Sequence, residues 1–143
     1  AAGLFSFLIS RSGLPADVGE WINANFDSGW TFLLAVNLLL LFVGMFIETS
    51  AAILVLAPIL APVAIAFGVD PVHFGLIMVV NLAIGMFTPP LGVNLFAACA
   101  IANLSLEKMI PWLIQFVVVA IGCLLLVTYF PVISLGLVDL MYR

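Results

Sequence analysis

The residues best suited to chemistry lie inside a long uncharged stretch, NLAIGMFTPPLGVNLF at 81–96. Thr88 precedes Pro89 and Pro90, and each proline lacks a backbone N–H and clashes with the preceding helical turn. A continuous helix cannot pass this point, and we expect an extended link at TPP. Carbonyls before the link lose their helical donors. Together with the Thr88 hydroxyl they form hard oxygen ligands suited to an alkali cation.

Gly85 and Gly92 flank this break, and Asn94 follows it. The N–H groups that begin the second half of the helix suit an anion, and Asn94 is the side chain best placed to face such a site. Unpaired backbone groups are costly in lipid, so the break must be buried in protein or line a watery cavity. The alternative is a proline kink that only shapes packing. The Pro-Pro pair, flanked by Thr and two glycines, favours a functional site.

Glu48, Thr49 and Ser50 form a second group of oxygen-bearing residues. Glu48 is the one charged residue in 30–67, and an intramembrane ionisable residue is a functional candidate by default. If this point reaches the far interface, Glu48 is simply wet, and both interpretations stay open. The tripeptides VNL and GMF precede both this group and the proline pair, and the number of residues between VNL and GMF differs in the two places. This echo hints that both segments end a helix at a comparable site.

The remaining polar residues in apolar surroundings favour structural roles. His73 is expected at an interface rather than as a metal ligand. Asn37, Asn81 and Asn103 are expected to join helices through hydrogen bonds. An intramembrane protease would need a Ser with a Lys or His base, or paired aspartates, at membrane depth. His73 and Lys108 are expected at interfaces and no buried Asp pair is present, so the sequence argues against an enzyme.

The amino-acid composition indicates whether water or lipid surrounds this chain. Hydrophobic residues make up 66% of the sequence and charged residues 7%, against roughly 45–50% and about 25% in soluble domains. The chain cannot bury so much apolar surface in a core of its own, so it is an integral membrane protein within a lipid bilayer. Only three basic residues are present, so nucleic acid is excluded as a partner.

The elements that must position these residues are all helical. The start has no Met and holds half a membrane crossing, so we expect a C-terminal piece of a larger protein. The polar stretch 11–29 has Leu14, Val18, Trp21 and Ile22 on one helical face; a plain surface loop is the alternative. The predicted elements are the end of a helix at 1–10, an interfacial amphipathic arm at 11–29, a helical hairpin at 30–67, a broken helix at 71–103 and a last transmembrane helix at 111–136.

The motifs around the two sites resemble a known transporter family. A hairpin with a Ser/Thr tip followed by a proline-broken helix resembles the second inverted repeat of the ion-transporter superfamily. The segments GMFIETSAAILVLAPILAPVA, DPVHFGLIMVVNLAIGMFTPPLGVNLF and LEKMIPW are similar to the large membrane subunit of TRAP transporters, the tripartite ATP-independent periplasmic carriers. The resemblance covers about residues 30–115.

This resemblance implies a function and a set of partners. It implies sodium-driven uptake of an organic acid, such as a C4-dicarboxylate or sialic acid, by an elevator movement of a re-entrant hairpin and the broken helix. Sodium would be the coupling ion, with no other cofactor. The protein would lie in the bacterial inner membrane as a multi-pass subunit. Its partners would be the N-terminal repeat of the same subunit, a small four-helix membrane subunit and a soluble periplasmic binding protein.

The resemblance also implies roles for individual residues. Those expected around a sodium ion are Thr49, Ser50, Gly85, Met86, Thr88 and Pro89. Those expected to face the substrate are Glu48, Gly92 and Asn94.

Two alternatives and a question of orientation remain at this stage. A single-component sodium/dicarboxylate carrier of the same superfamily would need no binding protein, and a structural membrane subunit would have no substrate site. Counting the predicted membrane crossings along the chain places Arg11 and Arg143 on one side of the membrane and Lys108 on the other. The positive-inside rule would make the first side cytoplasmic. The resemblance instead implies that the hairpin enters from the periplasmic side, and we adopt that orientation.

Overall fold

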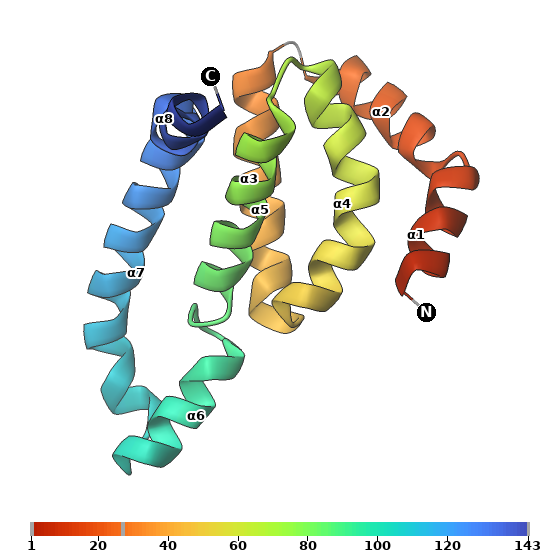
Figure 1. Ribbon diagram of the computed structural model, residues 1–143. Coiled ribbons are helices and arrows are strands. Elements are labelled where there is room, and N and C mark those ends of the chain that lie inside the picture. The colour runs from red at the N-terminus through yellow and green to blue at the C-terminus, as the bar shows by residue number, and fades with distance from the viewer. Residues whose placement is uncertain (1, 27, 143) are drawn as a thin grey trace.

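The computed structural model describes residues 2–26 and 28–142, so Arg143, which enters the orientation above, lies outside it. The described residues form α-helices and no strand, which confirms the all-α prediction. In chain order the helices are α1 (Ala2–Arg11), α2 (Leu14–Asn25), α3 (Gly29–Phe46), α4 (Thr49–Ala66), α5 (Pro71–Gly85), α6 (Val93–Ala102), α7 (Leu106–Tyr129) and α8 (Pro131–Tyr142) (Figure 1).

Three helices are long and apolar enough to cross a membrane. Among the described residues these are α3 and α4, with 18 residues each, and α7, with 24 residues. At 1.5 Å per residue they measure about 27 Å and about 36 Å. Helices α5 and α6 are shorter, with 15 and 10 residues, and are equally apolar in character. The chain is therefore a membrane protein by helix length and composition.

Helix α5 lies at the centre of the arrangement (Figure 1). Helices α3 and α4 form an antiparallel pair, and α5 runs back alongside both in the direction of α3. Helices α1 and α2 pack against α4 on the outer side. Beyond the end of α5 the chain continues into α6, turns, and returns through α7 to α8, which reaches the first part of α5.

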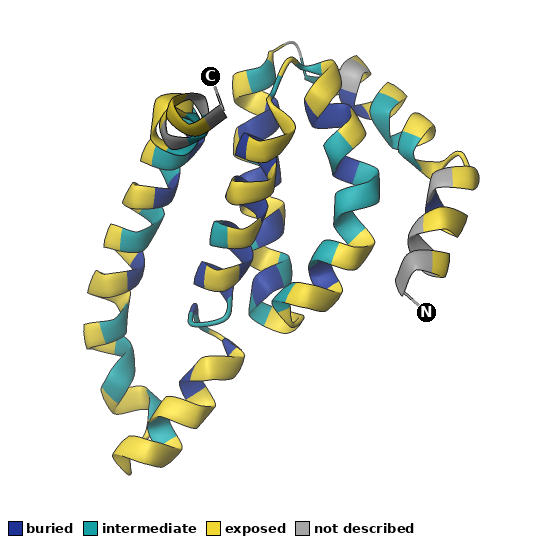
Figure 2. Cartoon of the chain, in the orientation of Figure 1, coloured by how far each residue is buried: buried dark blue, intermediate teal, exposed yellow. Residues whose placement is uncertain are grey.

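The buried core follows this arrangement. Phe74, Ile77 and Leu82 of α5 pack in one cluster with residues of α3 and α4, including Leu40 and Ala64. Figure 2 shows that the buried residues face inward along α3, α4 and α5, whereas most of α6 and α7 is exposed. Exposed apolar side chains on α7 suit contact with lipid, because hydrocarbon imposes no cost on them.

Local sequence signals explain where the central helices begin. The Asp70 side chain accepts hydrogen bonds from the backbone N–H groups of Val72 and His73, and Pro71 is the first helical residue. An aspartate cap satisfies N–H groups that have no helical partner, and proline is pre-organised for the first position. Gly68, at φ 79°, turns the chain out of α4 in the left-handed conformation that glycine tolerates.

The last long helix differs from its prediction at both ends. It runs over Leu106–Tyr129 rather than 111–136. Pro111 lies inside the helix, one turn from its start, where the proline ring leaves one early carbonyl without its helical donor. Pro131 instead begins a new helix, α8, since proline favours a first helical position over an interior one.

The polar arm is a helix with a narrower buried face than predicted. In α2, Ile22 is buried and Val18 is half-buried against the core, but Leu14 and Trp21 are exposed. At 3.6 residues per turn these four positions span an arc of about 100°, with Leu14 and Trp21 at one edge. Packing against α4 covers only the other edge of that arc.

Candidate functional site

The structure brings the tip of the α3–α4 hairpin against the end of α5. The Thr49 hydroxyl, in the first residue of α4, donates a hydrogen bond to Met86 Sδ at 3.1 Å. Met86 is the first residue after α5. Two of the residues predicted around one ion, which are 37 positions apart in the sequence, therefore lie in contact.

A close backbone approach lies directly beside this contact. A Cβ atom added at Gly44 of α3 would lie 2.8 Å from the Leu82 carbonyl oxygen. A Cβ added at Gly85 of α5 would lie 2.7 Å from the Gly44 Cα. Because real Cβ atoms do not approach backbone so closely, only glycine at both positions allows this crossing of α3 and α5. Small residues permit such close crossings in membranes.

The break between α5 and α6 is a compact series of turns, which corrects the extended link expected above. The Thr88 N–H donates to the Gly85 carbonyl at 2.9 Å, the Gly92 N–H to the Thr88 carbonyl at 3.2 Å, and the Asn94 N–H to the Met86 carbonyl at 3.1 Å. The Pro89–Pro90 peptide bond is cis. Several carbonyls that lost helical donors are thus paired by N–H groups of the break itself.

Thr88 is buried within the break, with 6% of its surface exposed. Its hydroxyl donates to the Ile84 carbonyl at 2.7 Å. The hydroxyl protons of Thr49 and Thr88 therefore both point to acceptors of the α5 end. Each hydroxyl oxygen keeps lone pairs that are free to bind another electrophile.

Glu48 and Ser50 are bonded to each other rather than to the break. The exposed Glu48 carboxylate accepts hydrogen bonds from the Ser50 N–H at 3.0 Å, the Ser50 hydroxyl at 2.9 Å and the Ala51 N–H at 3.1 Å. It lies in the turn outside both helices, where these bonds, the Ser50 N–H first, hold its pKa below the ordinary value of 4.5. Glu48 thus caps α4 as an ionised group.

The other predicted residues lie around the turn of the break. Pro89 is half-buried and Gly92 is buried. A Cβ on Gly92 would lie 2.8 Å from the Met86 carbonyl oxygen, so glycine is needed to close the turn. The Asn94 side chain is exposed at the start of α6.

His73 is buried between helices near the start of α5. Only 2% of its surface is exposed. Its Nε2 lies 3.1 Å from the Thr128 carbonyl oxygen, and its Nδ1 is hydrogen-bonded to the Ser134 hydroxyl. The ring therefore joins α5 to α7 and α8, a position that only the return of the chain through α7 creates.

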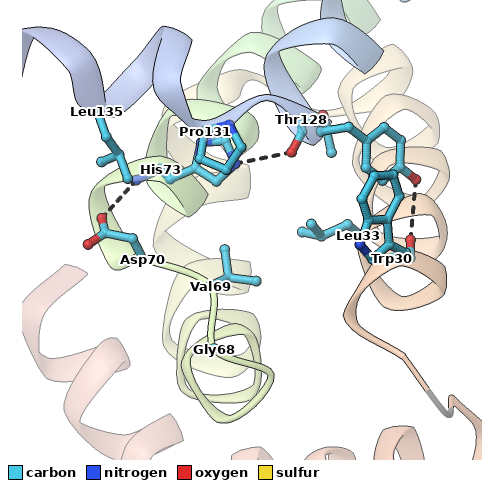
Figure 3. A pocket seen from close by; sticks show the side chains of 10 residues that line it. Trp30, Leu33, Gly68, Val69, Asp70, His73, Thr128, Pro131 and Leu135 are labelled. Atoms are coloured by element: carbon cyan, nitrogen blue, oxygen red, sulfur yellow. Dashed lines mark hydrogen bonds between the residues drawn. The ribbon is translucent and has the colours of Figure 1, made fainter.

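A cavity of about 310 Å³ lies at the end of the molecule where α5 begins, away from the break (Figure 3). Figure 3 shows His73 hydrogen-bonded to Thr128 on one side of the cavity and Trp30 on the other. Tyr129, which also lines the cavity, lies against Trp30. The two aromatic rings stack at 4.6 Å, and the Tyr129 hydroxyl donates to the Trp30 carbonyl at 3.2 Å. No predicted site residue lines this cavity.

The buried asparagines form the helix contacts expected of them. Asn81 Nδ2 donates to Asn37 Oδ1, which joins α5 to α3. Asn37 Nδ2 donates to the Thr128 hydroxyl at 3.1 Å, which joins α3 to α7. Asn103, in contrast, is exposed and ends α6 in the left-handed conformation.

The sequence analysis did not predict the role of Gly44, and it placed Met86 near the ion without predicting that its side chain contacts the hairpin tip. Gly44 permits the close crossing, and the Met86 side chain accepts the Thr49 hydroxyl proton. The repeated tripeptides VNL and GMF were the one sequence pattern that pointed to these contacts. Asn37 pairs with Asn81, and Gly44 with Gly85, so the two copies of each tripeptide lie against each other.

These features define a multi-helix membrane protein in which a hairpin tip is seated on an interrupted helix. Residues 1–133 match the family model described as "Tripartite ATP-independent periplasmic transporter, DctM component". The chain belongs to this family, as the resemblance in its motifs indicated. This is a family of transporter permeases rather than of enzymes.

Curated relatives agree with the family assignment. The chain is 46% identical to a C4-dicarboxylate TRAP transporter large permease protein of Rhodobacter capsulatus, over 98% of this chain and 32% of the relative. It is 42% identical to the corresponding protein of Pseudomonas aeruginosa, over 95% and 32%. It is 37% identical to a sialic acid TRAP transporter large permease protein of Vibrio cholerae, over 96% and 32%. The chain spans about a third of the length of these relatives.

Proposed function

We propose that this chain forms part of a secondary active transporter that couples sodium entry to uptake of an organic acid. The observation that carries the proposal is the Thr49–Met86 contact, which joins the hairpin tip to the break in the α5–α6 segment. The hairpin tip and the break would each supply ligands to one ion. A bound ion therefore favours the conformation in which the tip and the break are in contact.

The donor chemistry at this contact suits sodium. Thr49 and Thr88 offer hydroxyl oxygens whose protons point elsewhere. The Gly85 and Met86 carbonyls each accept one N–H within the turn and keep a second lone pair. Hard oxygen donors of this kind suit alkali cations. No cluster of His, Cys, Asp and Glu that could hold a transition metal occurs in the part of the chain that the structure describes. The Met86 thioether is a soft group, so its proposed role is to orient the Thr49 hydroxyl.

Ser50, Glu48, Gly92 and Asn94 take less direct roles in this proposal. The exposed Ser50 hydroxyl donates to Glu48 rather than to the end of α5, so Ser50 belongs to the cap of α4. Asn94 is exposed at the start of α6, where helix N-terminal N–H groups attract anions. We assign the substrate anion to the side of Gly92 and Asn94, and the cap of α4 to Glu48.

The heights of the elements support a re-entrant hairpin. In Figure 1 the α3–α4 tip lies level with the end of α5, while α6 and the start of α7 extend well beyond it. If α7 crosses the membrane, the tip stops short of the far side, in a cavity open to water in which the exposed Glu48 stays solvated. This arrangement is compatible with an elevator movement in which the hairpin and the broken helix travel together.

The partners follow from the family. The chain corresponds to about a third of the large permease, so the rest of the subunit would supply the other half of the substrate site. A small four-helix membrane subunit and a soluble periplasmic binding protein would complete the complex in the bacterial inner membrane. Relatives are named for C4-dicarboxylate and for sialic acid, so the proposed substrate class is an organic acid.

Sodium titration of uptake tests the proposal in the complete transporter. Thr49→Val and Thr88→Val each remove one oxygen ligand, so each should raise the sodium concentration for half-maximal uptake by about tenfold, the change expected for about 1.4 kcal/mol of lost binding. Thr31→Val, which removes an exposed hydroxyl bonded to Ser28, is the control. Unchanged sodium curves in both site variants would refute the assignment. Uptake that needs no soluble binding protein would indicate a single-component carrier instead.

A further inference from the structure

Helices α3 and α5 run in the same direction and touch at two successive levels. Asn37 of α3 receives a hydrogen bond from Asn81 of α5, and both side chains are buried, with 4% and 0% of their surface exposed. Nearer the tip, Gly44 of α3 meets Gly85 of α5 backbone to backbone. One contact is polar and directional, and the other is steric.

The spacing of the contacts keeps each pair on one helix face. Asn37 and Gly44 are seven residues apart on α3, and Asn81 and Gly85 are four residues apart on α5. Both separations return to nearly the same side of a helix with 3.6 residues per turn. Each helix therefore presents an amide and, one or two turns later, a glycine to its neighbour.

These contacts lie next to the residues that would hold the ion. Gly44 precedes the tip residue Thr49 by little more than one turn, and Gly85 directly precedes Met86. A sliding or rotation of α3 against α5 would separate the Asn37 and Asn81 amides and bring the Cβ atoms of larger residues into the glycine crossing. The contacts thus set the height of the tip relative to the break.

We infer that Asn37–Asn81 and Gly44–Gly85 form a two-point register lock that positions the Thr49 tip against the break. This inference rests on the proposed function for its effect on sodium, but not for its effect on the position of the tip. Gly44 and Asn37 act as positioning residues, because neither is among the residues that would touch the ion.

The first experiment measures the position of the tip without reference to sodium. Thr49→Cys and Met86→Cys are introduced together in the complete transporter, with Cys99, Cys123 and any cysteine in the rest of the transporter replaced by alanine. A short thiol cross-linker should join the two positions efficiently. Adding Gly44→Ala should strongly reduce the cross-link, because the new methyl group would meet the Leu82 carbonyl oxygen at 2.8 Å. Gly75→Ala on α5, where a Cβ meets nothing within 4 Å, is the matched control and should leave the cross-link intact.

The second experiment measures the sodium dependence of uptake in the transporter that keeps its native cysteines and carries no added ones. Gly44→Ala should raise the sodium concentration for half-maximal uptake by about tenfold or more, since a misplacement of about 1 Å can cost a factor of about 100 at a site. The maximal rate per folded complex should change much less. A residue that only stabilised the fold would lower the amount of complex and leave the half-maximal concentration unchanged. Gly75→Ala and Gly122→Ala should match the unaltered protein in both measurements.

Asn37→Ala tests the other contact and carries the test if Gly44→Ala fails to accumulate in the membrane. It introduces no clash, so it should weaken the cross-link and shift the sodium curve in the same direction by a smaller factor. An intact cross-link in Asn37→Ala, and in Gly44→Ala where that variant folds, would overturn the lock. A lost cross-link together with unchanged sodium curves in Thr49→Val and Thr88→Val would support the lock and refute the proposed sodium site.

Discussion

At the scale of single residues, side chains near the tip divide into two hydrogen-bonded groups. Thr49 and Thr88 donate to acceptors at the end of α5, whereas Ser50 donates to Glu48. The first group joins the hairpin to the break, and the second stabilises the start of α4. Adjacent residues of the same chemical type, Thr49 and Ser50, thus act on different partners because successive helical positions point about 100° apart.

Glu48 predicts a pH dependence of stability. Its pKa is lowered in the folded protein by the Ser50 and Ala51 donors, so it stabilises the fold fully above its ordinary value of 4.5. This contribution is lost as the pH falls through the lower folded value. Purified transporter should therefore exceed Glu48→Gln in unfolding free energy at neutral pH, and the difference should shrink below pH 4.5. Chemical unfolding of both proteins across this range would show it, and a difference that grows on acidification would contradict it.

At the scale of elements, α7 is attached to the rest of the molecule mainly near its C-terminal end. Thr128 accepts from Asn37 through its hydroxyl and lies against His73 through its carbonyl, and Tyr129 bonds to Trp30. Helix α7 also contacts α6, and Phe116 of α7 lies beside Phe87 of the break. Buried polar groups join helices in lipid because apolar surfaces gain little from meeting each other there.

Thr128→Val tests the polar attachment of α7. The substitution keeps the shape but leaves the buried Asn37 amide without its acceptor. The free energy of unfolding in detergent should fall by roughly 1 kcal/mol, within the range measured for hydrogen bonds between membrane helices. The control Thr31→Val alters an exposed hydroxyl and should cost less. Equal losses in both variants would show that the buried bond contributes nothing specific.

At the scale of the whole molecule, the linkers lie at two opposite ends. The connection from α4 to α5 lies at one end, and the turn from α6 to α7 lies at the other, with the hairpin tip between them (Figure 1). The proposed orientation places the first end in the periplasm. In this orientation both ends of the α3–α4 hairpin lie on the periplasmic side, and its tip points away from that side (Figure 1).

Cysteine labelling tests this orientation in the complete transporter. With Cys99, Cys123 and any cysteine in the rest of the transporter replaced by alanine, Val72→Cys and Leu104→Cys place single thiols at exposed positions near opposite ends. A membrane-impermeant maleimide should label Val72→Cys in intact spheroplasts and Leu104→Cys only after permeabilisation. The reverse pattern would agree with the positive-inside rule and overturn the orientation. Labelling of both from one side would overturn the placement of these ends across the membrane.

Many local features could be predicted because a few adjacent residues decide them. The Asp70–Pro71 pair marks the start of α5, and the Pro89–Pro90 pair ends helical structure near it, since missing N–H groups cannot be restored by packing. The helix at Pro111 was placed less well. A proline near a helix start is compatible both with the first position and with the second turn, and only packing against neighbouring helices selects one.

The sequence by itself determined the solvent, the helical class and the positions of the breaks, because composition and backbone chemistry act locally. The tertiary structure decided which residues meet. Asn37 and Asn81 are 44 positions apart, and His73 and Ser134 are 61 apart. Their contacts depend on how α3, α5, α7 and α8 pack, and no rule of local spacing contains that information. The same packing placed the tip on the break and buried His73 between α5, α7 and α8.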